Sequence, residues 1–215
     1  LNEIENAEKL YSSNGIMAAL DLTYRFKTLL DLTLTTSYQR THSDNSTWFG
    51  EKSNYAAQLR NAEYGQAPIP GDYGLSDMPY GGVYNTGTNV NENFTLRAQA
   101  NFRHALGEKK LHLLSASLGY EMNVSNTDGF SENTRGFFKS RGLKYVNMTA
   151  EEMNRFPKYA SWVAHNHPTL RADKTHRLSG YAIFSYSYGS LFSLSANTRF
   201  DASNKFGSRS NEKFL

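Results

Sequence analysis

The sequence predicts an all-β protein: an antiparallel, up-and-down meander of about six long strands that forms part of a transmembrane β-barrel. Three observations lead to this prediction. Apolar and polar side chains alternate along extended stretches of the chain. Short turns alternate with two long connections. The 215 residues are only 39% hydrophobic, with a mean hydropathy of −0.62, although 13% of them are aromatic.

The alternation is clearest in residues 90–103, VNENFTLRAQANFR. The even-numbered residues of this segment are apolar apart from Glu92, and the odd-numbered residues are all polar. Successive side chains of a strand point to opposite faces, so this strand has one apolar and one polar face. A helix would instead repeat apolar residues every three or four positions. The segment is also longer than the usual strand of about 5–6 residues.

Three hairpins follow one another along the chain, each made of two alternating segments and a short turn. The paired segments are 16–27 with 29–40, 90–103 with 111–124, and 175–188 with 191–202. The turns are Lys27-Thr28, residues 104–110, and Gly189-Ser190. Aromatic residues gather near the strand ends, where a barrel wall meets lipid headgroups. These aromatic residues are Tyr24, Phe26, Tyr38, Tyr120, Tyr186, Tyr188, Phe192 and Phe200.

Two long connections, residues 42–89 and 125–174, separate the hairpins and are rich in Gly, Asn, Ser and Tyr. Loops of this size are uncommon in compact soluble domains. Transmembrane barrels, in contrast, have short turns on one side of the membrane and long loops on the extracellular side. We therefore expect the even-numbered face to contact lipid and the odd-numbered face to line a lumen. The alternative is a soluble β-sandwich, a carbohydrate-binding or adhesin module whose apolar face is buried beneath a second sheet.

Six strands are too few to close a barrel in a membrane, because the smallest membrane barrels have about eight. Residues 1–14 resemble the end of a preceding loop, and residues 202–215 resemble the beginning of a further one. We expect residues 1–215 to form a partial β-barrel domain, with the plug and N-terminal domains of a complete protein absent from this sequence.

The composition excludes several classes of function. Basic and acidic residues are interspersed and nearly balanced, with a net charge of +3, so no nucleic-acid-binding face is indicated. The absence of cysteine excludes a disulfide framework, a thiolate metal site and a cysteine nucleophile.

Five stretches resemble the SusC/RagA family of TonB-dependent outer-membrane transporters. They are residues 48–55 (WFGEKSNY), 59–65 (LRNAEYG), 79–82 (PYGG), 135–142 (RGFFKSRG) and 197–207 (NTRFDASNKFG). The last stretch is similar to the family's recurrent strand-to-loop signature, Arg-aromatic-Asp-small-Ser-x-Lys/Arg-Phe-Gly. Ala202 and Asn204 stand where family members often carry Gly and Ser.

The resemblance implies a transporter rather than an enzyme, located in the outer membrane of Bacteroidetes-type bacteria. Such a transporter imports oligosaccharides or peptides through a barrel of about 22 strands. The implied partners are a SusD-like surface lipoprotein, outer-membrane lipid, and TonB, which acts through an N-terminal region that this sequence lacks. No cofactor is implied. Whether the substrate is a glycan or a peptide does not follow from the resemblance.

Two groups of residues are candidates for a functional role. The aromatic residues of the first long connection suit contact with substrate or with the lipoprotein lid, since aromatic faces and polar groups together bind sugars or peptides. The polar strand faces supply residues that either line the solute pathway or form a seat for the plug. The first group is Trp48, Tyr55, Tyr80 and Tyr84, and the second is Arg25, Arg97, Glu121 and Arg199.

No catalytic or metal-binding residue is predicted. His42-Ser43-Asp44 contains the residue types of a hydrolase triad, but adjacent side chains point in different directions. His165-Asn166-His167 has no further ligands at suitable spacing, so we interpret it as a plain loop.

Two short helices are expected within the long connections. Ser53 is a candidate cap for a helix that runs to Glu63 and ends at Gly65. Thr149 and Glu152 have capping-box spacing, with Pro157 closing the turn.

Overall fold

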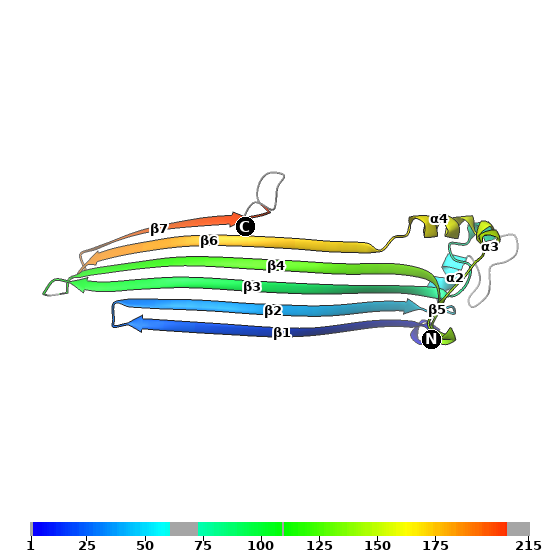
Figure 1. The fold of residues 1–215 in the computed structure, drawn as a ribbon, viewed down its shortest axis with the longest axis horizontal. Coiled ribbons are helices and arrows are strands. Elements are labelled where there is room, and N and C mark those ends of the chain that lie inside the picture. The colour runs from blue at the N-terminus through cyan, green and yellow to red at the C-terminus, as the bar shows by residue number, and fades with distance from the viewer. Residues whose placement is uncertain (1, 61–72, 109, 206–215) are drawn as a thin grey trace. The chain divides into compact units, whose positions relative to one another are not determined.

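A computed structural model describes residues 2–60, 73–108 and 110–205, and shows one antiparallel sheet of up-and-down strands. Six long strands follow the spatial order β1-β2-β3-β4-β6-β7, and a two-residue strand, β5, pairs with β4 (Figure 1). The sheet is not closed, which confirms the predicted meander. The strands are β1 (Ala7–Phe26), β2 (Leu30–Phe49), β3 (Gly82–Leu106), β4 (His112–Phe138), β5 (Lys144–Tyr145), β6 (Thr169–Tyr188) and β7 (Phe192–Ser203).

The long strands extend well beyond the apolar alternation that predicted them. Residues 7–14 belong to β1 rather than to a preceding loop, and β2 continues to Phe49. The connections predicted at 42–89 and 125–174 shrink to residues 50–81 and 139–168. In the added portions polar side chains bond across neighbouring strands: the hydroxyls of Ser13 and Ser43 are 3.0 Å apart. Backbone pairing needs no apolar face, so a search for apolar alternation missed these ends.

The three short turns occur where they were predicted. Leu29 N donates to Phe26 O at 3.3 Å, Lys110 N to Gly107 O at 2.9 Å, and Leu191 N to Tyr188 O at 3.0 Å. Gly107 has a φ of 85° and Gly189 a φ of 48°, a backbone region that glycine enters without steric cost.

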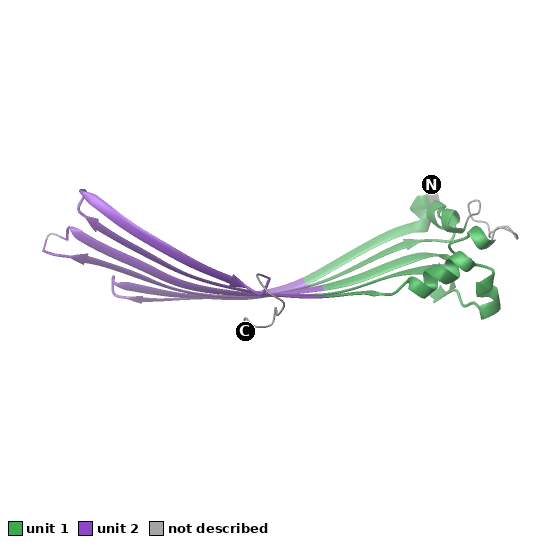
Figure 2. Ribbon diagram, turned by 90° about the horizontal axis from the view of Figure 1, so that it is seen from above, with its two compact units in different colours: residues 1–14, 42–89, 128–171 green, residues 15–41, 90–127, 172–215 purple. Residues whose placement is uncertain are grey.

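The chain divides into two compact units, coloured separately in Figure 2. Unit 1 comprises residues 1–14, 42–89 and 128–171, and unit 2 comprises residues 15–41, 90–127 and 172–215. The described helices all belong to unit 1. They are α1 (Asn2–Asn6), α2 (Asn54–Arg60), η1 (Tyr73–Leu75), η2 (Lys139–Arg141), α3 (Ala150–Asn154) and α4 (Pro157–His165). Within the described residues no helix has the length and apolar content needed to cross a membrane.

Unit 1 has a small hydrophobic core beneath α2. Ala56, Met78 and Val83 are fully or almost fully buried, and Phe49 and Leu59 pack against them. This core packs the end of β2, helix α2 and the start of β3 against one another.

The described residues of unit 2 form strands and turns, and the register of β6 and β7 separates the two faces. Even-numbered residues pair with even-numbered ones, such as Phe184 with Ala196 and Tyr186 with Leu194. Odd-numbered residues pair likewise, such as Ser179 with Asp201. Large apolar side chains of the even-numbered set are exposed, and Leu118 has 60% of its surface accessible. No described residue of unit 2 forms a second layer over this face.

Gly119 provides a seat for an aromatic ring on the odd-numbered face. A Cβ atom built on Gly119 would lie 2.1 Å from Tyr181 Cζ, so the Tyr181 ring occupies the space that a side chain at position 119 would fill. Gly180, by comparison, has no neighbour closer than Gly119 O at 4.0 Å. The position of the Tyr181 ring therefore requires a glycine at position 119 on the adjacent strand β4.

Replacement of Gly119 by Ala should destabilise the folded protein by about 1–3 kcal/mol, because the Tyr181 ring must leave its seat. Denaturant unfolding of the full-length protein in detergent measures this. Gly180→Ala serves as the matched control and should be nearly neutral. A double variant that also carries Tyr181→Ser should recover most of the loss. Equal effects of the two glycine substitutions would contradict this packing.

Candidate functional site

The odd-numbered face of unit 2 carries a continuous set of hydrogen-bonded polar side chains. Between β3 and β4, Arg97 donates to Glu121 Oε2 through Nε at 2.9 Å and through Nη2 at 2.6 Å. Two further bonds flank this ion pair: Asn123 donates to Thr95 at 3.0 Å, and Ser117 donates to Asn101 at 2.8 Å. Polar groups of β3 and β4 are therefore matched across the boundary between these two strands, as cross-strand pairs are in stable sheets.

A polar hollow of about 750 Å³ lies on this face between β4, β6 and β7. Arg199 Nε contacts both carboxylate oxygens of Asp201, at 3.0 and 2.8 Å, and Ser179 Oγ donates to Asp201 at 2.6 Å. The hollow is lined by Glu121, Asn123, Arg177, Ser179, Arg199, Asp201, Ala202, Ser203 and Lys205. It brings charges of both signs together at an exposed surface.

Three of the four residues predicted to face a lumen or plug meet at or beside this hollow. Glu121 and Arg199 line it, and Arg97 is bound to Glu121. Arg25 lies elsewhere, between β1 and β2, where its Nε donates to Asp31 at 3.0 Å. These ion pairs are exposed to solvent, so each contributes little to folding stability. The arrangement suits a polar lining more than a buried structural core.

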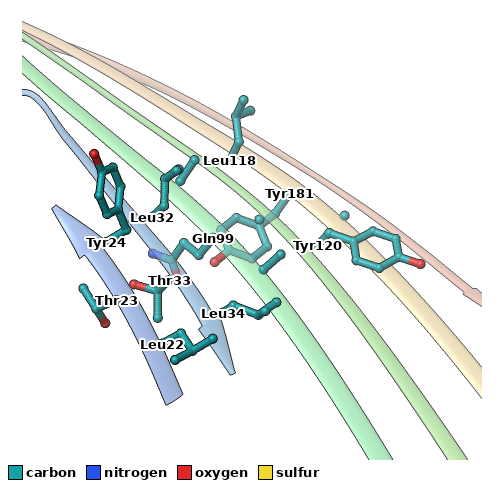
Figure 3. Close-up of a pocket in the computed structure, with 14 residues that line it drawn as sticks. Leu22, Thr23, Tyr24, Leu32, Thr33, Leu34, Gln99, Leu118, Tyr120 and Tyr181 are labelled. Atoms are coloured by element: carbon teal, nitrogen blue, oxygen red, sulfur yellow. The ribbon is translucent and has the colours of Figure 1, made fainter. Parts of the chain in front are cut away.

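Unit 2 also has a broad, shallow and mostly apolar hollow of about 830 Å³ (Figure 3). Most of its lining residues belong to the even-numbered set, and Thr23, Thr33, Gln99 and Tyr181 of the odd-numbered set line it as well. Leu22, Leu32 and Leu34 from β1 and β2, together with Leu118 and Tyr120 from β4, line it. The hollow is open to solvent, and most of its exposed lining surface is apolar. It follows the apolar face rather than enclosing a small ligand.

The four aromatic residues predicted to contact substrate or lid do not converge on one site. Trp48 packs over Gly50, with Lys139 Nζ 4.7 Å from its ring centroid. Tyr84 stacks on Phe137 at 4.7 Å between ring centroids. Trp48 and Tyr84 both line a small hollow of about 230 Å³.

The other two aromatic residues lie apart. Tyr55 packs on Phe49, with ring centroids 4.7 Å apart. Tyr80 contacts Phe156 edge-on at 6.2 Å and lines a separate hollow of about 450 Å³. Tyr80 is 43% exposed, so part of its surface is accessible to solvent.

Arg60 fixes the first long connection, a role that sequence reasoning missed. Its side chain is almost fully buried, and it donates to Gly81 O at 3.1 Å and to Glu51 O. Burial lowers the pKa of its guanidinium, and the nearby charge of Glu51 partly opposes this shift. Ser53 caps α2 as predicted, accepting from Ala56 N at 3.1 Å. The predicted end of this helix, at Glu63 and Gly65, lies outside the described residues.

The second connection contains the predicted capping box at the start of α3. Thr149 Oγ1 accepts from Glu152 N, and Glu152 accepts from Thr149 N at 2.8 Å. Pro157 does not simply close this turn; it occupies the first turn of a further helix, α4, which its fixed φ favours. His165 is the last residue of α4 rather than part of a plain loop.

The residues of the predicted non-catalytic segment 42–44 make separate contacts in the structure. His42 Nε2 lies 2.9 Å from Asp44 Oδ2, but Ser43 bonds to Ser13 instead of joining them. No group of three or more metal-ligating side chains occurs in the described part of the chain.

Comparison with known proteins identifies the fold. No protein-family profile matches the chain, and no curated protein matches it. Solved structures of the RagAB peptide importer do match. In the closed-closed state of that importer, the match covers 93% of this chain with a TM-score of 0.63 and 17% sequence identity. In the open-open state, it covers the same share with a TM-score of 0.64 and 16% sequence identity. This chain spans only 19% and 18% of those chains, about a fifth of their length.

The likeness is one of fold. It covers 93% of this chain, and the matching chains are about five times as long. The low identity leaves the roles of individual side chains to be argued from the geometry above.

The capping box makes α3 sensitive to pH. The hydrogen bonds from the Thr149 backbone and hydroxyl lower the pKa of Glu152, so the ionised carboxylate stabilises the helix. This stabilisation is complete above the ordinary glutamate pKa of about 4.3 and is lost as the pH falls through the lowered value. Amide exchange of Met153, corrected for intrinsic rates, should therefore accelerate in acid. Glu152→Gln should abolish the pH dependence, whereas the exposed Glu151→Gln should preserve it; the same profile in both variants would contradict the assignment.

Proposed function

We propose that this chain forms part of the wall of an outer-membrane, TonB-dependent transporter of the SusC/RagA type. One observation carries the proposal: a single sheet has an exposed apolar face on its even-numbered residues and a hydrogen-bonded polar face on its odd-numbered residues. A barrel wall between lipid and a wet lumen requires this combination. The fold similarity to the RagAB peptide importer supports it.

The open edges of the sheet support membership of a larger barrel. β1 and β7 end the strand order without pairing to each other. In a bilayer each unpaired backbone group costs several kcal/mol, so the edges need further strands. We propose that other strands of a longer protein supply them. We also propose that the polar hollow lined by Glu121 and Arg199, with Arg97 beside it, faces the lumen or a plug domain.

The proposed cargo is an oligosaccharide or a peptide, taken up with a SusD-like lipoprotein partner and energised by TonB. Among the four aromatic candidates, we propose Tyr80 for substrate or lid contact, because it is 43% exposed and lines the hollow of about 450 Å³ in unit 1. The structure accounts for Trp48, Tyr55 and Tyr84 through packing against Lys139, Phe49 and Phe137.

A soluble β-sandwich module is a weaker explanation. It requires a second sheet over the apolar face, and the described residues form one sheet. An outer-membrane enzyme requires a cluster of acidic, Ser or His side chains, and the described His42–Asp44 pair lacks a converging nucleophile.

Placing Lys at Leu96 or Leu118 should impair assembly of the full-length protein in the outer membrane. A cation on the lipid face near the bilayer midplane costs about 2–4 kcal/mol. Gln99 lies on the other face, where its Nε2 donates to Asn101 at 2.9 Å, and Gln99→Lys should be mild. Membrane fractionation and heat-modifiable gel mobility measure the outcome. Equal tolerance at all three positions would refute the proposed orientation.

A further inference from the structure

The hairpin formed by the end of β4, η2 and β5 carries two basic residues that line the same hollow as Tyr80. Phe138 pairs with Lys144 and Phe137 with Tyr145 across the hairpin. Val146 N closes its base by donating to Gly136 O at 2.7 Å. Gly142 has a φ of 75° and allows the tight reversal between η2 and β5. Backbone hydrogen bonds therefore fix the positions of Arg141 and Lys144.

These two cations line the hollow of about 450 Å³ that also contains Tyr80 and Asn147. Arg141 lies over the buried Phe138 ring, with 4.4 Å between its Cζ and the ring centroid. Such stacking orients the guanidinium and leaves its in-plane N–H groups available. The remaining lining residues are Glu51, Phe138, Tyr145 and Val146.

The charges in this hollow are not balanced within the described part of the chain. Neither Arg141 nor Lys144 forms an ion pair with a described carboxylate, in contrast to Arg97, Arg199 and Lys139. Glu51 contributes one carboxylate to the lining, so the two cations leave this hollow with one positive charge in excess. Two cations beside aromatic rings and an amide match the needs of an anionic group attached to an organic ligand.

We propose that Arg141 and Lys144 bind a carboxylate of the transported solute, with the aromatic ring of Tyr80 contacting the neighbouring part of that solute. This inference rests on the proposed transport function and narrows its substrate to carboxylate-bearing molecules. A planar guanidinium binds a carboxylate through two parallel hydrogen bonds, and the ammonium adds a point charge. Peptides with a free C-terminus and acidic oligosaccharides share this chemistry.

Calorimetric titration of the full-length protein in detergent tests the site without relying on transport. The probes are a pentapeptide lacking Asp and Glu, as the free acid and as the C-terminal amide, and trigalacturonate with its methyl ester. The carboxylate form of at least one pair should bind more tightly than its neutral form. Arg141→Gln and Lys144→Gln should each weaken that binding by about tenfold, while Arg141→Lys retains part of it.

Arg155→Gln is the matched control, because Arg155 is an exposed cation of unit 1 that does not line the hollow. Loss confined to the peptide pair identifies peptides as the source of the carboxylate, and loss confined to the uronate pair identifies acidic glycans. Carboxylate and neutral probes that bind alike, or hollow variants that match Arg155→Gln, would overturn the inference. If the unaltered full-length protein still assembles in the outer membrane, either of these results refutes the carboxylate site but not the proposed transport function. If the unaltered protein does not reach the outer membrane, the proposed function itself is refuted.

Discussion

Each face of a single-layered sheet needs an environment that matches its side chains, and the rest of the structure depends on this constraint. Apolar surface in water is costly in proportion to its area, so a face with exposed Leu22, Leu118 and Phe200 needs an apolar environment. The opposite face is polar and satisfies its groups internally, through pairs such as Arg97 with Glu121. Lipid on one side and water or polar protein on the other meet both needs.

The same constraint explains why the two units are built differently. Unit 2 is built from strands and short turns, where alternation alone determines which side chains share a face. Unit 1 adds polar strand ends, a small core around Met78 and the buried Arg60, which binds two backbone carbonyls. Binding residues are often carried on loops held by a rigid scaffold, and the β4–β5 hairpin with Arg141 and Lys144 has this character.

Much of the fold was predictable because strand periodicity is a strong local signal. The three hairpins, their turns, the Ser53 cap and the Thr149–Glu152 capping box all follow from short-range chemistry. The strand ends did not follow, because polar residues such as Ser13 and Ser43 extend the ladder without an apolar pattern. Helix α4 was missed because Pro157 fits both the end of one helix and the start of another.

The candidate sites were predictable only in part. Alternation identified Arg97, Glu121 and Arg199 as sharing one face, but it gave no means of separating Arg25 from their hollow. The grouping of Tyr80 with Arg141 and Lys144 depends on contact between connections far apart in the sequence. The basic run KSRGLK at 139–144 was the available signal for it.

Site-directed spin labelling of the full-length protein in lipid bilayers tests the central claim most directly. Labels at Phe94, Leu96 and Ala98 should collide readily with oxygen and poorly with a water-soluble nickel complex, whereas labels at Thr95 and Gln99 should show less access to oxygen. Free access of the nickel complex to the first three positions, or their burial against protein with access to neither reagent, would contradict the account.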